Sequence, residues 1–204
     1  MDSQTVSYYS SNAIHLATRY DGIVSSLSHH FETSFLPHSK LLDIGCGSGR
    51  DLSILHTLGH DCYGIDPTPE CVTLAQQAHP ELLGRIANGC LPELSPPFLG
   101  DFDGVLCSAV LMHISVEDLE SSAYAIKNCL RTNGRLLYSV PTKRLDVVTE
   151  DRDVNGRLFI PNQSQRLLAI FENIGFVELK TWANADSFGR DAVEWESVFL
   201  ERKT

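Results

Sequence analysis

The sequence predicts an α/β fold, a doubly wound and mostly parallel sheet of seven strands with a C-terminal antiparallel hairpin and an N-terminal helical cap. Two observations predict it. Strand-like and helix-like patterns alternate from Lys40 onward, as they do in consecutive β–α–β units. The last two strand-like segments follow each other with no helix between them, so they must pair as a hairpin.

The expected strands are short apolar runs bounded by turn residues. They cover residues 40–44, 61–65, 83–88, 102–108, 134–140, 176–183 and 193–201, with the final turn around residues 185–189. Between the strands, Ser115 opens a capping box for one helix, which stops before Asn133 and Gly134. Asn162 starts a second helix, which Gly175 ends.

The N-terminal residues 7–35 have an amphipathic helical pattern. Apolar Ile14, Ala17, Val24 and Leu27 recur at helical spacing between tyrosines. We therefore expect residues 1–36 to form a cap or lid on the main domain of residues 37–204, within one globular unit. A structural cap over the sheet edge is the alternative to a lid.

Length, charge and cysteines limit the classes of function. A chain of 204 residues suits one domain with a full core. The six cysteines form no C-x-x-C pair, and no histidine spacing indicates a metal site. Residues 1–4 do not begin a signal peptide and no apolar run is long enough for a membrane helix, so we expect a soluble, cytoplasmic protein. The formal net charge of −10 disfavours nucleic acid as a substrate.

The segment from Leu41 to Arg50 is the most informative in the chain. An apolar strand feeds a turn with Gly45, Gly47 and Gly49, and a helix must begin there. Free N–H groups at that helix start favour a polar ligand. The spacing is G-x-G-x-G, and Arg50 stands where a nicotinamide-binding fingerprint has its third glycine.

Asp66 supplies the second half of this signal. It ends the next strand about twenty residues after the glycines, where an acid commonly accepts ribose hydroxyls. The alternative is an ordinary tight turn followed by an acid that caps a helix. Together, the glycine turn and the acid indicate a nucleoside-containing ligand.

With Asp43 leading the glycines, this pattern resembles motif I of the class I S-adenosylmethionine-dependent methyltransferases, which have a Rossmann-like sheet of seven strands. The resemblance implies S-adenosylmethionine as cofactor. It implies that Asp43, Gly45, Cys46 and Gly47 line its methionine part, Asp66 its ribose, and Asn88, Gly89 and Cys90 its adenine. The family often has an acid near the adenine, so Asn88 is a departure. The resemblance also implies that Ser108, Arg19 and Tyr20 reach the cofactor.

His113, just after the fourth strand, is the candidate general base. An imidazole has a suitable pKa, and the position points toward the acceptor pocket. The alternative is an exposed histidine without a chemical role. The (Asp/Asn)-Pro-Pro-(Tyr/Phe) run of methyltransferases that act on nucleic-acid amino groups is absent here.

Three arginines are candidates for binding the acceptor. Arg152 and Arg157 lie in residues 141–161, a stretch without clear periodicity that we expect to be a long functional loop. Either one can clamp a carboxylate or phosphate, although ion pairing with the nearby acids is the alternative. Arg190, in the closing hairpin, is the third candidate.

The sequence thus indicates an enzyme that moves a methyl group from S-adenosylmethionine to an O, N or S atom of a small metabolite. A protein or RNA methyltransferase and a non-catalytic S-adenosylmethionine-binding regulatory domain are the alternatives. A nicotinamide-dependent oxidoreductase ranks last because of Arg50. The acceptor and the oligomeric state stay open.

Overall fold

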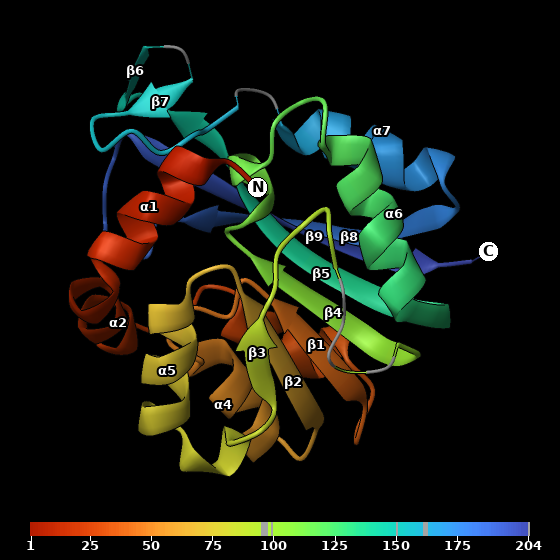
Figure 1. Cartoon of the computed structure of the whole chain (residues 1–204). Coiled ribbons are helices and arrows are strands. Elements are labelled where there is room, and N and C mark those ends of the chain that lie inside the picture. The colour runs from red at the N-terminus through yellow and green to blue at the C-terminus, as the bar shows by residue number, and fades with distance from the viewer. Residues whose placement is uncertain (95–97, 99, 150, 161–162, 204) are drawn as a thin grey trace.

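The computed structural model describes residues 1–94, 98, 100–149, 151–160 and 163–203. Its main sheet has the strand order β3-β2-β1-β4-β5-β9-β8, with the first five strands parallel (Figure 1). The two C-terminal strands pair antiparallel with each other, and β9 pairs antiparallel with β5. The predicted mostly parallel sheet with a closing hairpin is therefore confirmed.

The strand bounds follow the predicted ones closely in most places. The sheet consists of β1 (Lys40–Ile44), β2 (Asp61–Asp66), β3 (Ile86–Asn88), β4 (Phe102–Ser108), β5 (Leu130–Arg144), β8 (Phe176–Ala185) and β9 (Val193–Arg202). Two predicted bounds are wrong. The third strand begins only at Ile86, because residues 83–85 form a turn that follows the 3₁₀ turn over Pro80–Leu82. The fifth begins at Leu130, since that residue already pairs with Phe102 directly after a helix ends.

Helices cover both faces of the sheet and create two apolar cores. On one face, α4 (Arg50–Thr57), α5 (Pro69–Ala78) and the short α3 (Phe31–Ser34) pack with Leu41 and Leu106. On the other face, α6 (Leu119–Cys129) and α7 (Gln163–Asn173) pack with Leu42 and Val105. Side chains that are neighbours in a strand point to opposite faces, so both must be apolar when both faces are covered.

Local signals explain where the helices begin and end. Ser115 Oγ accepts a hydrogen bond from the Asp118 amide at 3.3 Å, so Ser115 closes a turn just ahead of α6. Gly175 follows α7 with φ of 100°, a conformation that favours glycine. The predicted start of that helix at Asn162 lies outside the described residues.

The N-terminal segment forms several short helices instead of one amphipathic pattern. These are α1 (Ser3–Ser11), α2 (Ala13–Asp21) and a 3₁₀ turn over Ser28–His30 ahead of α3. The predicted apolar face over residues 7–35 is only partly confirmed: Leu27 is buried and Ala17 is half-buried, but Ile14 and Val24 are 73% and 70% exposed. Breaks after α1 and α2 change the helical phase, so Ala13 and Leu16 become buried instead.

The stretch of residues 141–161 is not one long loop. The strand β5 continues to Arg144, and β6 (Val147–Thr149) pairs antiparallel with β7 (Arg152–Asp153). Figure 1 shows this small hairpin beside α1, above the carboxyl ends of the central strands. The segment lacked a recognisable period because its strands are only two or three residues long. No helix in the described part of the chain has the length and apolar character needed to cross a bilayer.

Candidate active site

The glycine turn after β1 lies where the strand order reverses, between β1 and β4, which is where open α/β sheets bind ligands. Gly45, Gly47 and Gly49 have φ of 75°, 54° and 82°. A Cβ on Gly45 would lie 2.3 Å from Cγ2 of Val110, which follows β4. Among the described residues, no atom lies within 4 Å of a Cβ built on Gly47. Gly45 therefore allows close packing, whereas Gly47 leaves room for a ligand.

Asp66, at the end of β2, fastens this turn. Its Oδ2 accepts a hydrogen bond from the Gly47 amide at 2.9 Å, and its Oδ1 accepts one from the Thr68 amide at 2.9 Å. Burial raises the pKa of Asp66, and these two amides partly oppose that rise. Asp66 also lines the cavity, so it both shapes the turn and faces the space beside it.

Asp43 is a buried carboxylate without a partner. It is 2% exposed, and its Oδ1 is enclosed with no hydrogen bond from the described residues. Burial raises the pKa of Asp43 well above its usual value, and the charges of Asp51 and Asp66 raise it further. Since buried charges are normally paired, this end of the cavity has an unmet requirement for a cation.

The cap is tied to the glycine turn through Arg50 and Asp51. Arg50 donates from Nη1 to the carbonyl of Tyr20 at 3.1 Å and from Nε to Asp51 at 2.9 Å. Asp51 also accepts from Ser25 Oγ at 3.1 Å. The cap residues Arg19 and Tyr20 line the cavity, and both pack on Phe188 of the β8–β9 turn. The structure thus brings these two predicted residues to the same cavity as the glycine turn.

One cavity of about 360 Å³ extends from the glycine turn to the β6–β7 hairpin. Of the predicted cofactor-site residues, it is lined by Asp43, Gly45, Cys46, Gly47, Asp66, Ser108, Arg19 and Tyr20. Asn88, Gly89 and Cys90 are not among its lining residues. Instead, the Asn88 side-chain amide and the Gly89 amide both donate to the Asp66 carbonyl, at 3.0 Å each.

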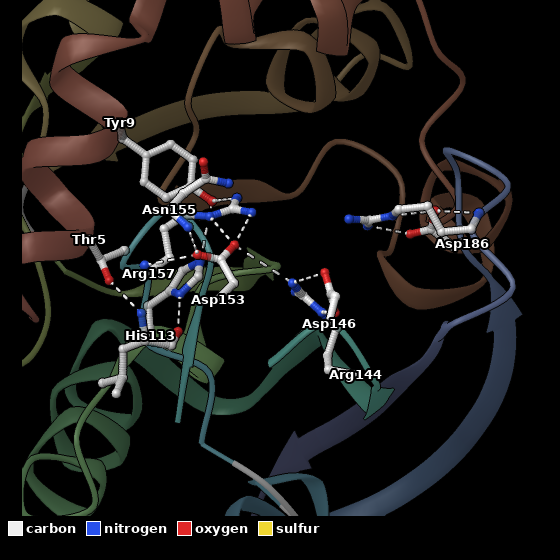
Figure 2. Close-up of polar contacts among 11 residues, drawn as sticks. Thr5, Tyr9, His113, Arg144, Asp146, Asp153, Asn155, Arg157 and Asp186 are labelled. Atoms are coloured by element: carbon white, nitrogen blue, oxygen red, sulfur yellow. Dashed lines mark hydrogen bonds and ion pairs between the residues drawn. The ribbon is translucent and has the colours of Figure 1, made fainter. Parts of the chain in front are cut away.

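His113 lies at the other end of this cavity, in the short 3₁₀ turn Leu111–His113. It is 3% exposed, so its interpretation as an exposed histidine is wrong. Its Nδ1 lies 2.6 Å from the carbonyl of Leu158, which can only accept, so Nδ1 carries the proton. Its Nε2 then accepts from the Tyr9 hydroxyl at 3.3 Å (Figure 2).

The surroundings keep this imidazole neutral. Burial lowers the pKa of His113 to about 4, and the nearby guanidiniums of Arg157 and Arg144 act in the same direction. The ring also packs against Phe159, with ring centroids 4.7 Å apart. A neutral imidazole of fixed tautomer keeps one lone pair, at Nε2, at neutral pH, and its pKa of about 4 makes it a weaker base than a free histidine.

Ion pairs lie at this end of the cavity. Asp153 accepts from Arg157 Nε and Nη2 at 2.9 and 2.6 Å, and Arg157 Nη1 donates to the Tyr9 hydroxyl at 3.3 Å. Arg144 forms two hydrogen bonds with Asp146. Figure 2 shows His113, Tyr9 and the Asp153–Arg157 pair together, with Arg144 and Asp146 next to them.

The three arginines predicted to bind the acceptor occupy different positions. Arg157 and Arg190 line the cavity, whereas Arg152 does not. Arg152 forms two hydrogen bonds with Asp2 of the cap, at 3.0 and 2.8 Å. The alternative interpretation of ion pairing is confirmed for Arg157, although its pair with Asp153 is buried and not on the surface.

Sequence reasoning missed Tyr9 and Arg144 as site residues. Tyr9 is 104 positions from His113, and no local pattern connects the two. Arg144 falls in the segment expected to be a loop, yet its side chain is only 7% exposed. No group of three His, Cys, Asp or Glu side chains suited to a metal occurs among the residues that the structure describes.

Comparisons with known proteins agree with this geometry. A family model described as a methyltransferase domain matches residues 13–203. The mitochondrial ubiquinone biosynthesis O-methyltransferase of Bos taurus is 30% identical over 140 residues, which are 66% of this chain and 37% of that protein. The chain therefore spans well under half the length of this curated relative.

Two solved structures share the fold across nearly the whole chain. The [4+2]-cyclase SpnF superposes with a TM-score of 0.76 at 17% sequence identity. The match covers 100% of this chain and 98% of the SpnF chain. The 1,6-didemethyltoxoflavin-N1-methyltransferase of Burkholderia thailandensis, solved with its namesake ligand and S-adenosylhomocysteine, has a TM-score of 0.74 at 18% identity. That match covers 98% of this chain and 88% of the other.

Proposed function

This chain belongs to the class I S-adenosylmethionine-dependent methyltransferases, and from that membership we propose that it moves a methyl group from S-adenosylmethionine to an O, N or S atom of a small molecule. The observation that carries the proposal is one cavity of about 360 Å³ that joins the glycine turn and its carboxylates to His113. A cofactor site and a proton acceptor thus share one enclosed space.

The residues at the glycine turn fit this cofactor. Its ammonium and sulfonium groups are cationic, and Asp43 is a buried carboxylate without a described partner. Gly47 leaves the backbone open to a ligand, and Asp66 lies beside it. We expect Asp43 to face the methionine part and Asp66 the ribose. When bound, S-adenosylmethionine would supply a methyl group activated by its sulfonium sulfur, which would be left as a neutral thioether.

His113 and Tyr9 handle the proton of the acceptor in this proposal. Tyr9 donates its hydroxyl hydrogen to His113 Nε2, so the Tyr9 oxygen has a lone pair left for the acceptor's O–H or N–H. As the acceptor atom bonds to the methyl carbon, its proton passes to the Tyr9 oxygen and the Tyr9 proton passes to Nε2. Arg157 holds the Tyr9 hydroxyl in place from its other side at 3.3 Å.

The cap limits the access of water to this space. Helix α1 is fastened to the β6–β7 hairpin by the Asp2–Arg152 pair and by Thr5 Oγ1, which accepts from the Leu158 amide at 2.9 Å. Alignment of the two reactants and removal of water are the main contributions a protein can make to an in-line methyl transfer.

Binding of the cofactor is tested first, by titration calorimetry with S-adenosylmethionine and S-adenosylhomocysteine. Both ligands should bind and should raise the melting temperature by mass action. Asp66→Ala should lose most of that rise, whereas Glu120→Gln, at an exposed position of α6, should keep it. Failure of both ligands to bind folded protein would refute the proposal.

Methyl transfer needs its own test. Protein incubated with methyl-labelled S-adenosylmethionine and a small-molecule extract should label a compound of low molecular weight. The His113→Gln variant should label it far more slowly while binding the cofactor normally. Label found only in protein or RNA of an unfractionated extract would contradict the small-molecule acceptor.

A further inference from the structure

Arg144, the last residue of β5, is a buried arginine with unused hydrogen-bond donors. Its side chain is 7% exposed, and it lines the cavity. Its Nε and Nη2 donate to Asp146 at 2.6 and 2.8 Å, but its Nη1 has no hydrogen-bond partner in the described ranges. A guanidinium carries five N–H donors. Nη1 of Arg144 is not enclosed by the described residues, so a ligand in the cavity can accept a hydrogen bond from it.

Arg190, in the β8–β9 turn, has the same arrangement. Its Nε and Nη2 donate to Asp186 at 2.9 and 2.7 Å, while its Nη1 has no partner in the part of the chain that the structure describes. Asp186 also accepts from Trp195 Nε1 at 2.9 Å and from the Phe188 and Arg190 amides. Both carboxylate oxygens of Asp186 thus accept hydrogen bonds, and Asp186 fixes the orientation of the Arg190 guanidinium.

The two arginines belong to the same end of the cavity. Arg144, through its hydrogen bonds, and then Arg190, through its charge, lower the pKa of Asp146. Figure 2 shows Arg144 and Asp146 lying between the Asp153–Arg157 pair and Asp186. The free Nη1 groups therefore come from neighbouring segments that are far apart in sequence.

The third arginine of this region, Arg157, differs from both. Its Nε and Nη2 bind Asp153, and its Nη1 binds the Tyr9 hydroxyl. The Asp153 oxygens accept from Arg157 and from the amides of residues 155 and 157. The carboxylates of Asp146, Asp153 and Asp186 thus have partners, while Arg144 and Arg190 each keep an N–H group without a partner among the described residues.

Aromatic side chains form the walls around these donors. The Arg144 guanidinium carbon lies 3.6 Å from the centroid of the Phe159 ring, and the same ring packs against His113. Trp195 and Phe188 line the cavity near Arg190. Flat apolar walls favour a flat, aromatic ligand body.

We propose that this end of the cavity is an oxyanion-binding subsite, in which Nη1 of Arg144 and Nη1 of Arg190 bind the carboxylate of an aromatic acceptor whose nucleophilic atom lies toward Tyr9 and His113. The inference rests on the proposed function and names its substrate class. A neutral acceptor leaves these donors with weaker partners, whereas a carboxylate forms charge-assisted, paired hydrogen bonds with them.

The test compares two ligands of equal shape on protein saturated with S-adenosylhomocysteine. The probes are para-hydroxybenzoate and para-hydroxybenzamide, which differ in charge and hardly in size. We expect the carboxylate to bind at least about tenfold more tightly than the amide in titration calorimetry. Equal binding of the two probes, or no binding of the carboxylate, overturns the proposal.

Variants then locate the binding groups. Arg144→Met and Arg190→Met should each weaken the carboxylate about tenfold or more and leave the amide nearly unchanged. Arg166→Met, at an exposed position of α7, is the matched control and should change neither. Arg144→Lys and Arg190→Lys keep the charge in case a methionine variant fails to fold, and they should bind the carboxylate with intermediate affinity. Unchanged carboxylate affinity in folded Arg144 and Arg190 variants refutes the subsite.

The same titrations separate this inference from the proposed function. If S-adenosylhomocysteine does not bind, the proposed function fails. If it binds but the carboxylate and the amide are not distinguished, the cofactor assignment stands and only the acceptor class is wrong.

Discussion

The substitution Asp43→Asn should have two opposite effects on the protein. It keeps the shape of the side chain and removes a charge that is 2% exposed and receives no hydrogen bond from the described residues. Without ligand, the variant should be more stable than the natural protein. With S-adenosylmethionine, it should bind more weakly, because the carboxylate that faces a cationic ligand is gone.

The stability that Asp43→Asn gains should increase as the pH rises. Burial, then the charges of Asp51 and Asp66, raise the pKa of Asp43 well above its usual value of 3.8. The folded state therefore holds this proton more tightly than the unfolded state, and the chain loses stability as the pH rises from about 4 through the raised pKa. At pH values above that pKa, the variant should gain about 1–3 kcal/mol, the usual cost of a buried unsatisfied polar group. The gain should shrink as the pH falls toward 4.

The affinity loss follows from the strength of charged hydrogen bonds. A contact with a charged group contributes about 1.5–3 kcal/mol, which corresponds to a dissociation constant about 10 to 150 times higher. S-adenosylhomocysteine keeps the ammonium and lacks the sulfonium charge. An equal loss for both ligands would place Asp43 at the ammonium, and a loss for S-adenosylmethionine alone would place it at the sulfonium.

Thermal unfolding without ligand and titration calorimetry with both ligands measure the two effects. Glu120→Gln serves as the control, since it removes a charge at an exposed position. A general folding defect would lower both stability and affinity, so the opposite signs are diagnostic. Wild-type affinity for S-adenosylmethionine in the variant would refute the role of Asp43.

Three further predictions concern the base, the glycine turn and the cap. His113→Gln should slow labelling by about 10²–10⁴-fold, and labelling by the natural protein should fall as the pH drops through about 4, where His113 gains a proton. Gly45→Ala should prevent folding, seen by circular dichroism, whereas Gly47→Ala should fold and lose cofactor affinity in calorimetry. Asp2→Asn should weaken the contact with Arg152 and speed hydrogen exchange in α1.

Each of these has an outcome that contradicts it. An unchanged labelling rate in His113→Gln would exclude His113 as the base. Normal cofactor affinity in the Gly47 variant would mean that the ligand does not approach the backbone there. Unaltered exchange in α1 would show that the Asp2–Arg152 pair does not hold the cap down. Asp21→Asn is the comparison variant for Asp2→Asn. It removes a carboxylate at the end of α2, outside α1, to which Ser48 Oγ donates at 2.6 Å.

Folding stability should also depend on His113 in acid. Burial lowers its pKa from 6.5 to about 4, so the folded state binds this proton less well than the unfolded state. The stability that the neutral His113 contributes is fully present above about pH 6.5 and is lost as the pH falls toward 4. Denaturant titrations at several pH values in that range should show that the free energy of unfolding changes less with pH in His113→Gln than in the natural protein.

The parallel sheet and the glycine turn were predictable because their signals are local. Apolar runs, glycines at alternate positions and an acid at a strand end are imposed by covalent geometry and burial within a few neighbouring residues. The turn from Gly45 to Gly49 and the strand that ends at Asp66 accordingly lie close to where the sequence places them. The cap was less predictable, since the single residue Asn12 between α1 and α2 changes the helical phase.

By itself, then, the sequence determined the sheet, its closing hairpin and the residues beside the glycine turn. Only the tertiary structure decided which side chains meet at the acceptor end. Tyr9 and His113 are 104 positions apart, and Arg144 approaches the same space from the end of β5 while Arg190 approaches it from the β8–β9 turn. The choice of ion-pair partners, and hence which guanidinium N–H groups stay free, depends on distances and burial that arise only when the cap, the β6–β7 hairpin and the β8–β9 turn close around one cavity.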